Sequence, residues 1–134
     1  MGIYSLPIAQ FIEPYVKPQE NGNRTDVRWM YLANPAQQGL LVVADSLLSM
    51  SAWPYNQAAY EKAKHFNELK ESGYVTLNID LIQMGIGGND SWSEVAAPLE
   101  KYQVKAKNYS YRFYLCPVKL KEEQVAKDWQ KLKF

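Results

Sequence analysis

The chain has few of the residues that build disulfides, metal centres and nucleophilic active sites. Its 134 residues include one cysteine, Cys116, and one histidine, His65. A single cysteine excludes a disulfide within the chain, and the apolar, aromatic run around Cys116 predicts a buried thiol. With no second histidine and no cysteine cluster, no zinc-binding pattern is present, and we interpret His65 as a surface or packing residue. No serine lies in a Gly-x-Ser-x-Gly motif, which argues against a serine hydrolase.

The net charge is small, and long apolar runs are missing from the sequence. Fifteen Lys and Arg residues face 14 Asp and Glu residues, which gives a net charge of +1. Nucleic-acid-binding proteins usually carry a basic stripe, so we expect no nucleic-acid partner. No apolar stretch approaches the ~18 residues that span a bilayer, so we expect no membrane partner. The first residues have neither a basic n-region nor an apolar h-region, so we expect no signal peptide, and the compartment stays open between cytoplasm and periplasm.

Aromatic residues are plentiful, and they favour β-structure. Hydrophobic residues make up 47% of the chain and aromatic residues 13%, with ten Tyr and four Trp. A chain of this length can bury one real core, so we expect one domain. Aromatic enrichment also suits sugar-binding surfaces, although core packing explains most of it.

The periodicity of apolar residues predicts an antiparallel β-sandwich with one crossing helix and a short C-terminal helix. The region 3–12 contains Pro7 and is predicted as an edge strand or extended arm. Helical spacing over 56–72 predicts the crossing helix, with Asn56 as N-cap and Gly73 as its stop. We divide the chain into a sandwich portion, 1–118, and an extension, 119–134, with an amphipathic helical pattern. The predicted strands cover residues 27–33, 40–44 (after a turn at 34–39), 47–53 (after a break at 45–46), 74–84, 102–106 and 111–115, with Leu48, Met50 and Ala52 on one face and Tyr111, Phe113 and Leu115 facing inward.

The run MGIGGNDSWS, residues 84–93, is the most informative segment. Gly85, Gly87 and Gly88 allow backbone conformations that other residues avoid, so we expect them to shape a loop at the end of a strand. Trp92 follows this loop. From the residues alone, Trp92 either plugs the end of the sandwich or presents a flat face on which a sugar ring stacks, a contact on the order of 1–3 kcal/mol.

Two catalytic interpretations of this segment are weak. A dinucleotide-binding loop needs G-x-G-x-x-G at the start of a helix, but here Asp90 takes the sixth position and would repel phosphate. A glycosidase needs two carboxylates roughly 5–10 Å apart, and nothing in the spacing of Asp80, Asp90 and Glu94 selects that geometry. We therefore expect Asp80 and Asp90 to brace the loop by accepting backbone N–H hydrogen bonds.

Four segments, in order, resemble the C-terminal domain of the long-chain bacterial β-galactosidases of glycoside hydrolase family 2. GIGGNDSWS (85–93) resembles the family's GIGGDDSWS, and YVKPQENG (15–22) resembles its PSENG turn. LNID (77–80) matches the strand before the glycine loop, and YSYRF (109–113) resembles the last strand. The resemblance runs from about residue 15 to residue 118.

This resemblance implies both a fold and a function. It implies that the chain is the second half of the fifth domain, a sandwich of the galactose-mutarotase-like type. The family hydrolyses terminal β-galactosides such as lactose with retention, using two glutamates in a central TIM barrel that this chain lacks. The fragment alone is therefore expected to be inactive. By position, Trp92 would stack on the leaving (aglycone) sugar where this domain walls the active site. The Mg²⁺ and Na⁺ ligands belong to other domains, so no cofactor is expected here.

The chain departs from the family pattern in three places. Asn89 replaces the first of two acids, and the extension 119–134 has no counterpart in the best-known members. The chain has about half the length of the family domain, which would leave strand edges unpaired. We therefore expect edge pairing, a homo-oligomer or an altered path for the first strand. The expected partners are a β-galactoside or other sugar and the remaining domains of a parent enzyme.

Three alternatives to this interpretation remain. The chain could be a free-standing carbohydrate-binding module with the same fold and the same Trp92. It could serve as an assembly domain. A mutarotase-like epimerase is disfavoured, because that chemistry needs a general acid and base on the concave face, whereas His65 lies in the predicted helix. The sequence does not specify which galactoside linkage would be preferred.

Overall fold

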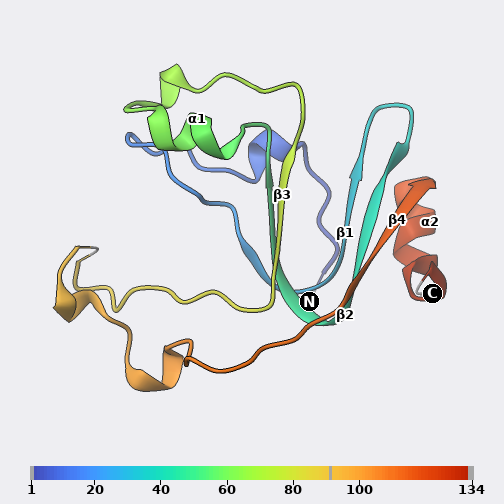
Figure 1. The fold of residues 1–134 in the computed structure, drawn as a ribbon. Helices are drawn as coiled ribbons and strands as arrows, with labels where there is room; N and C mark the ends of the chain where they lie inside the picture. The colour runs from blue at the N-terminus through green and yellow to red at the C-terminus, as the bar shows by residue number, and fades with distance from the viewer. Residues whose placement is uncertain (1, 91, 133–134) are drawn as a thin grey trace.

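The computed structural model describes residues 2–90 and 92–132, and its centre is a four-stranded antiparallel sheet (Figure 1). The strands are β1 (Arg24–Ala33), β2 (Gln38–Trp53), β3 (Thr76–Asp80) and β4 (Phe113–Lys119). β2 is the central strand: β1 pairs along one edge, while β4 and β3 pair with the first and last parts of the other edge. The described residues thus form a mainly antiparallel, partial β-sandwich rather than a closed barrel.

The predicted hairpin of β1 and β2 is confirmed, but the predicted break inside β2 is wrong. Asn34 closes the turn, where its Oδ1 accepts a hydrogen bond from the backbone N–H of Gln38 at 3.0 Å. β2 then continues through Asp45 and Ser46 without interruption. The N–H of Asp45 still finds a partner, the carbonyl of Arg112 at 3.1 Å, so the backbone stays extended. The pairing of β2 with β1 nevertheless shifts register twice: one extra residue lies on β1 between Arg24 and Val27, and three extra residues lie on β2 between Val43 and Leu48.

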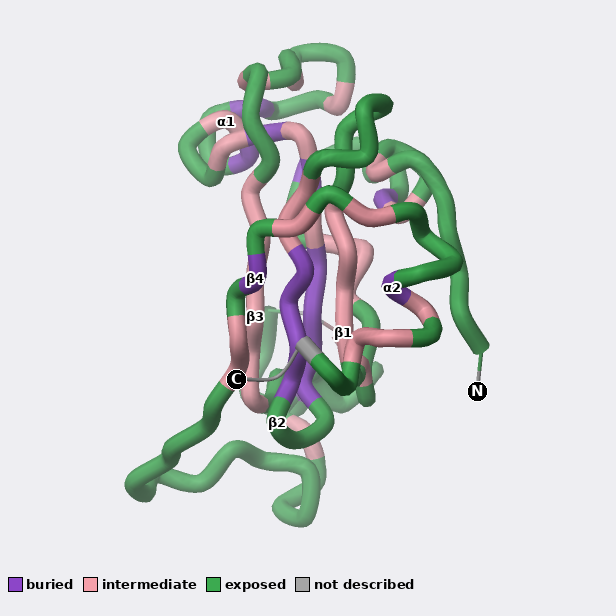
Figure 2. Tube along the Cα trace, turned by 90° about the vertical axis from the view of Figure 1, so that its right-hand side faces the viewer, coloured by how far each residue is buried: buried purple, intermediate pink, exposed green. Residues whose placement is uncertain are grey.

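Figure 2 shows buried residues along much of β2. Their side chains belong to two apolar clusters, one on each face of the sheet. Alternate residues of a strand point to opposite faces. Leu48 and Met50 share one face, as predicted, with Val42 and Ala44. The opposite face carries Leu41, Val43 and Cys116, and the predicted burial of the Cys116 thiol is confirmed.

The predicted C-terminal helix is present and covers this second face. α2 (Glu122–Asp128) is followed by the 3-10 turn η5 (Trp129–Leu132). Val125 is completely buried against the cluster of Leu41, Val43 and Cys116, and Trp129 packs beside it. The extension therefore closes one face of the sheet.

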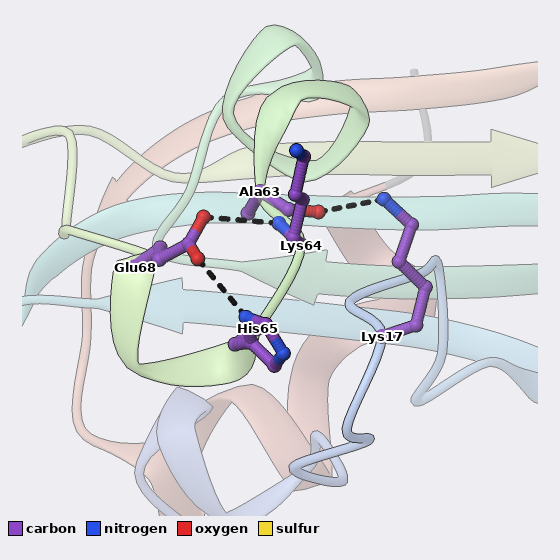
Figure 3. Close-up of polar contacts among 5 residues, drawn as sticks. All are labelled: Lys17, Ala63, Lys64, His65 and Glu68. Atoms are coloured by element: carbon purple, nitrogen blue, oxygen red, sulfur yellow. Dashed lines mark hydrogen bonds and ion pairs between the residues drawn. The ribbon is translucent and has the colours of Figure 1, made fainter.

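The crossing helix is much shorter than predicted. α1 spans Gln57–Lys62, and Asn56 caps it as expected, its Oδ1 accepting the Ala59 N–H at 2.7 Å. The helix ends at Ala63, where the backbone turns extended and the carbonyl accepts a hydrogen bond from Lys17 Nζ at 2.7 Å (Figure 3). The predicted stop at Gly73 is thus wrong, because side chains satisfy the backbone groups that another helical turn would have used.

Glu68 completes this local arrangement. Its carboxylate accepts the Lys64 N–H at 3.0 Å and lies 3.1 Å from Nδ1 of His65 (Figure 3). The hydrogen bond from Lys64, followed by that from His65, lowers the pKa of Glu68. His65 is an exposed partner of this carboxylate, in agreement with its interpretation as a surface residue.

Three further strand predictions need correction. Residues 3–12 form no strand: Pro7 precedes the 3-10 turn η1 (Ile8–Gln10), whose first hydrogen bond runs from the Gln10 N–H to the Pro7 carbonyl at 2.8 Å. The other alternative for this segment, an extended arm, stays a prediction. Residues 102–106 form no strand either, and the 3-10 turn η4 (Glu100–Tyr102) lies at their start. In β4, Leu115 is 53% exposed rather than facing inward, because Tyr114 and Cys116 take the covered face.

Candidate functional site

The long connection between β3 and β4, residues 81–112, carries the candidate site. Its described residues contain no strand, only the turns η3 (Glu94–Ala96) and η4. Figure 1 shows this segment, coloured yellow to orange, projecting far from the sheet. Loops positioned by a rigid scaffold are where binding residues concentrate, so the geometry within this segment decides what it can do.

Asp90 fixes the backbone on which Trp92 stands. Its Oδ1 accepts the N–H groups of Trp92 and Ser93 at 2.9 and 2.8 Å, and its Oδ2 accepts the Ser93 hydroxyl at 2.5 Å. The hydroxyl of Ser93 and then these backbone donors lower the pKa of Asp90. Asp90 is therefore an ionised brace of the turn, and the prediction that it accepts backbone N–H bonds is confirmed.

Two of the three glycines have a demonstrable geometric reason. Gly88 has φ of 88°, in the left-handed region that side chains rarely adopt. Gly87 donates its N–H to the Ala96 carbonyl, and a Cβ added there would lie 2.8 Å from the carbonyl oxygen of Ala97. A Cβ on Gly85 would meet nothing within 4 Å. The two ends of the 87–96 turn thus approach too closely for a larger residue at position 87.

Asn89 contributes a contact that the sequence did not reveal. Its Nδ2 donates to the Val95 carbonyl at 2.6 Å, a second bond across the turn. A carboxylate has no proton to donate, so the acid that resembled sequences carry at this position could not form this bond. The signal was present in the sequence as the amide in place of an acid, but its partner becomes known only from the fold.

Trp92 points away from the core. Its side chain is 86% exposed, so it does not plug the end of the sheet. Further apolar side chains of the same connection are also exposed: Ile82, Met84, Ile86, Val95, Leu99 and Tyr102. Large exposed apolar side chains that gather in one segment are typical of a region that contacts a ligand or another protein surface.

Asp80 and Asp90 both accept hydrogen bonds from neighbouring residues. A general acid has a raised pKa, whereas the pKa of Asp90 is lowered. Asp80 accepts a hydrogen bond from Nε2 of Gln83 at 2.9 Å, a side-chain donor instead of the backbone donor that was expected. These contacts fix the local geometry of the connection beside Trp92.

Neither a metal site nor a membrane span is found in the part of the chain that the structure describes. Within residues 2–90 and 92–132, no group of three or more His, Cys, Asp or Glu residues could hold a metal ion. No helix in the same residues is long and apolar enough to cross a membrane. We assign no residue of this chain to cofactor binding, and the placement of Mg²⁺ and Na⁺ ligands in other domains stays a prediction.

Comparison with models of known protein families gives a match that covers most of the chain. Residues 1–115 match the family described as beta galactosidase small chain. The chain belongs to this family. The matched residues include the whole 84–93 segment of this chain, whereas α2 lies outside them.

Curated relatives agree with this assignment. The chain is 34% identical over 119 residues to a beta-galactosidase of Priestia megaterium, an alignment that covers 88% of this chain and 11% of that protein. It is 36% identical over 115 residues to a beta-galactosidase of Vibrio cholerae, covering 86% of this chain and 10% of the relative. A beta-galactosidase of Lactobacillus delbrueckii subsp. bulgaricus is 39% identical over 99 residues, covering 73% and 10%. The chain thus spans about a tenth of the length of these relatives.

Proposed function

We propose that this chain is part of a β-galactosidase, in which Trp92 forms an aromatic platform for the leaving sugar. The observation that carries the proposal is the exposure of Trp92 on a backbone that Asp90 holds in place. Because Asp90 already holds the backbone of Trp92, little conformational entropy of the main chain is lost when a sugar ring stacks on the indole. The contact removes apolar area of both partners from water.

The rest of the connection supports a wall beside an active site. Ile86, Val95 and Leu99 are exposed apolar side chains, and burying them against the rest of a parent enzyme would favour association. The relatives are about eight times as long as this chain, so they have ample additional polypeptide for such a surface. In this arrangement the two catalytic glutamates come from outside the chain, and Trp92 positions the sugar that they release.

The first test uses the isolated chain and a chromogenic β-galactoside. We expect no turnover above that of buffer, since the two catalytic glutamates are proposed to lie outside this chain. Turnover by the purified chain that survives repeated purification would refute the assignment of catalysis to other domains.

The second test uses the assembled enzyme and the variant Trp92→Ala. Loss of stacking, about 1–3 kcal/mol, should weaken acceptor-sugar binding and transglycosylation by roughly 5- to 150-fold, with a smaller effect on galactose binding. Trp92→Phe retains a flat face and should recover part of the loss. Tyr102→Ala removes another exposed aromatic of the same connection and serves as the matched control. Equal loss of acceptor and galactose binding in Trp92→Ala would show a merely structural role.

The same variant distinguishes a free-standing carbohydrate-binding module. Such a module would bind a sugar through Trp92 without any partner, with the same affinity before and after addition of the barrel-containing part. Under our proposal, measurable acceptor binding through Trp92 strengthens when that part is present.

A further inference from the structure

A second hollow lies apart from Trp92, at the root of the long connection. It has a volume of about 360 Å³ and opens between the segment that precedes β1 and the residues that follow β3. Ser51 and Trp53 of β2 form its floor, and Glu20, Asn23 and Met84 are among its walls. This volume falls at the lower end of the range of small-molecule sites, roughly 300–1,000 Å³, so it suits a ligand of about one sugar ring.

Two buried polar atoms of this hollow have no hydrogen-bond partner among the described residues. They are Oδ1 of Asn23, an acceptor, and Nε1 of Trp53, a donor. Trp53 is 1% exposed, and its ring is held edge-on by Tyr60, with 5.5 Å between ring centroids. Burying a polar group without a partner costs free energy, and a hydroxyl group, which both donates and accepts, can satisfy either atom.

The charge of the lining selects among ligand classes. Glu20 is the only charged residue among the described residues that line the hollow, so an anion would be repelled. Oε1 of Glu20 accepts a hydrogen bond from Asn78 at 3.3 Å. A carboxylate has acceptor capacity for about four hydrogen bonds, so it can also receive ligand hydroxyls. Met84 adds an apolar surface that suits the C–H groups of a sugar ring.

The outer wall of the hollow can admit such a ligand. Gln83 and Met84 are exposed and belong to irregular chain after β3, where few backbone bonds hold the main chain in place. Two side-chain hydrogen bonds are found in this wall: Gln83 Nε2 donates to Asp80 at 2.9 Å, and the Val104 N–H donates to Met84 Sδ at 3.4 Å. Because the two unpartnered atoms are buried, a ligand hydroxyl reaches them only after these side chains move outward.

We propose that this hollow binds one neutral polyhydroxylated molecule, of the size of a single sugar ring, independently of Trp92. Trp53 Nε1 donates to one ligand hydroxyl, while Asn23 Oδ1 and the Glu20 carboxylate accept from others. Met84 lies against the carbon skeleton. The site does not depend on the role proposed for Trp92, because the residues that form it are different.

The test reads both sites separately in the full chain. The four tryptophans give separate indole N–H signals in a ¹⁵N NMR spectrum, and Trp53→Phe and Trp92→Phe assign two of them. We expect a saturable shift of the Trp53 signal on titration with galactose or glucose. Glu20→Gln, which keeps the shape but removes the charge, should weaken this binding about tenfold, as expected when a hydrogen bond to a charged group is lost.

Glu13→Gln is the control, since Glu13 is an exposed acid of the same N-terminal segment outside the lining. It should leave the titration unchanged. A Trp53 signal that does not move with either sugar overturns the proposal, and so does a shift that Glu20→Gln leaves intact. A shift of the Trp92 signal alone would reject this second site. A shift of the Trp53 signal alone would support it, and the platform is then decided by the test with the assembled enzyme.

Discussion

Val125 offers a direct measure of how much the C-terminal extension contributes to the fold. This side chain is 0% exposed and joins α2 to the sheet cluster of Leu41, Val43 and Cys116. Val125→Ala removes two carbon groups from this contact without introducing a polar atom. Alanine is also the better helix former, so any loss of stability comes from packing rather than from the helix itself.

The expected magnitude follows from the buried volume that is lost. At ~0.8 kcal/mol per buried carbon group, the transfer contribution is roughly 1.6 kcal/mol. A cavity contribution adds to this, since the surroundings relax only in part, and the total is about 2–3 kcal/mol. A domain of this size is stabilised by ~5–15 kcal/mol, and the melting temperature should therefore fall by roughly 10 °C.

Urea titrations followed by circular dichroism, with thermal melts in parallel, measure this loss. Lys127→Ala is the matched control: it lies on the exposed side of the same helix and should change stability by less than ~0.5 kcal/mol. If Val125→Ala unfolds at the same urea concentration as Lys127→Ala, the packing of α2 contributes nothing, and the reasoning from burial fails.

Three further outcomes are expected. Gly88→Ala, at φ 88°, should destabilise the turn by about 1 kcal/mol or more. Gly85→Ala, with open space around the added Cβ, should leave stability unchanged. Equal amide hydrogen-exchange rates in the turn of the two variants would contradict this expectation. The pKa of Asp90 in the folded chain is lowered, so its hydrogen bonds stabilise the turn above the ordinary pKa of 3.8. This stabilisation is lost as the pH falls through the pKa of the folded state. Trp92 fluorescence should report the loss, and Asp90→Asn should remove the pH dependence of the fluorescence. Burial, followed by the charges of Tyr55 and Glu20, raises the pKa of Tyr60 from 10.0 to about 12, so stability should decline as pH rises from 10 towards 12. Tyr60→Phe, which also removes a buried hydroxyl without a partner among the described residues, should reduce this decline at no cost at pH 7. A decline equal to that of the unchanged chain would exclude Tyr60 as a source.

The sequence predicted the elements whose signals are local. The hairpin depends on Asn34 and its neighbours, and the α1 cap depends on Asn56, three residues from its donor. The bracing role of Asp90 likewise involves residues within three positions. Such contacts follow from side-chain chemistry at fixed spacing, which a single sequence contains.

Features that depend on distant partners could not be predicted. The end of α1 is set by Lys17, 46 residues away in the sequence. β2 runs through Asp45 because the carbonyl of Arg112 lies beside it. The alternation at residues 102–106 has the period of a strand, yet none of the described strands pairs with it. The pattern was correct for an extended chain, but a strand also needs a neighbour.

The long connection between β3 and β4 can change in sequence and length without a change in the sheet. Its two ends are held on the same strand: Asp80 pairs with Ser49, and Phe113 pairs with Ala44, so the anchor points are about 17 Å apart at ~3.3 Å per residue. A connection of another length or sequence can join these points without altering the pairing of β2, and doubling its length costs only about 0.6 kcal/mol of closure entropy. The segment that carries Trp92 can therefore be lengthened or replaced, and new ligand preferences can arise in it, while the four-stranded sheet keeps its stability.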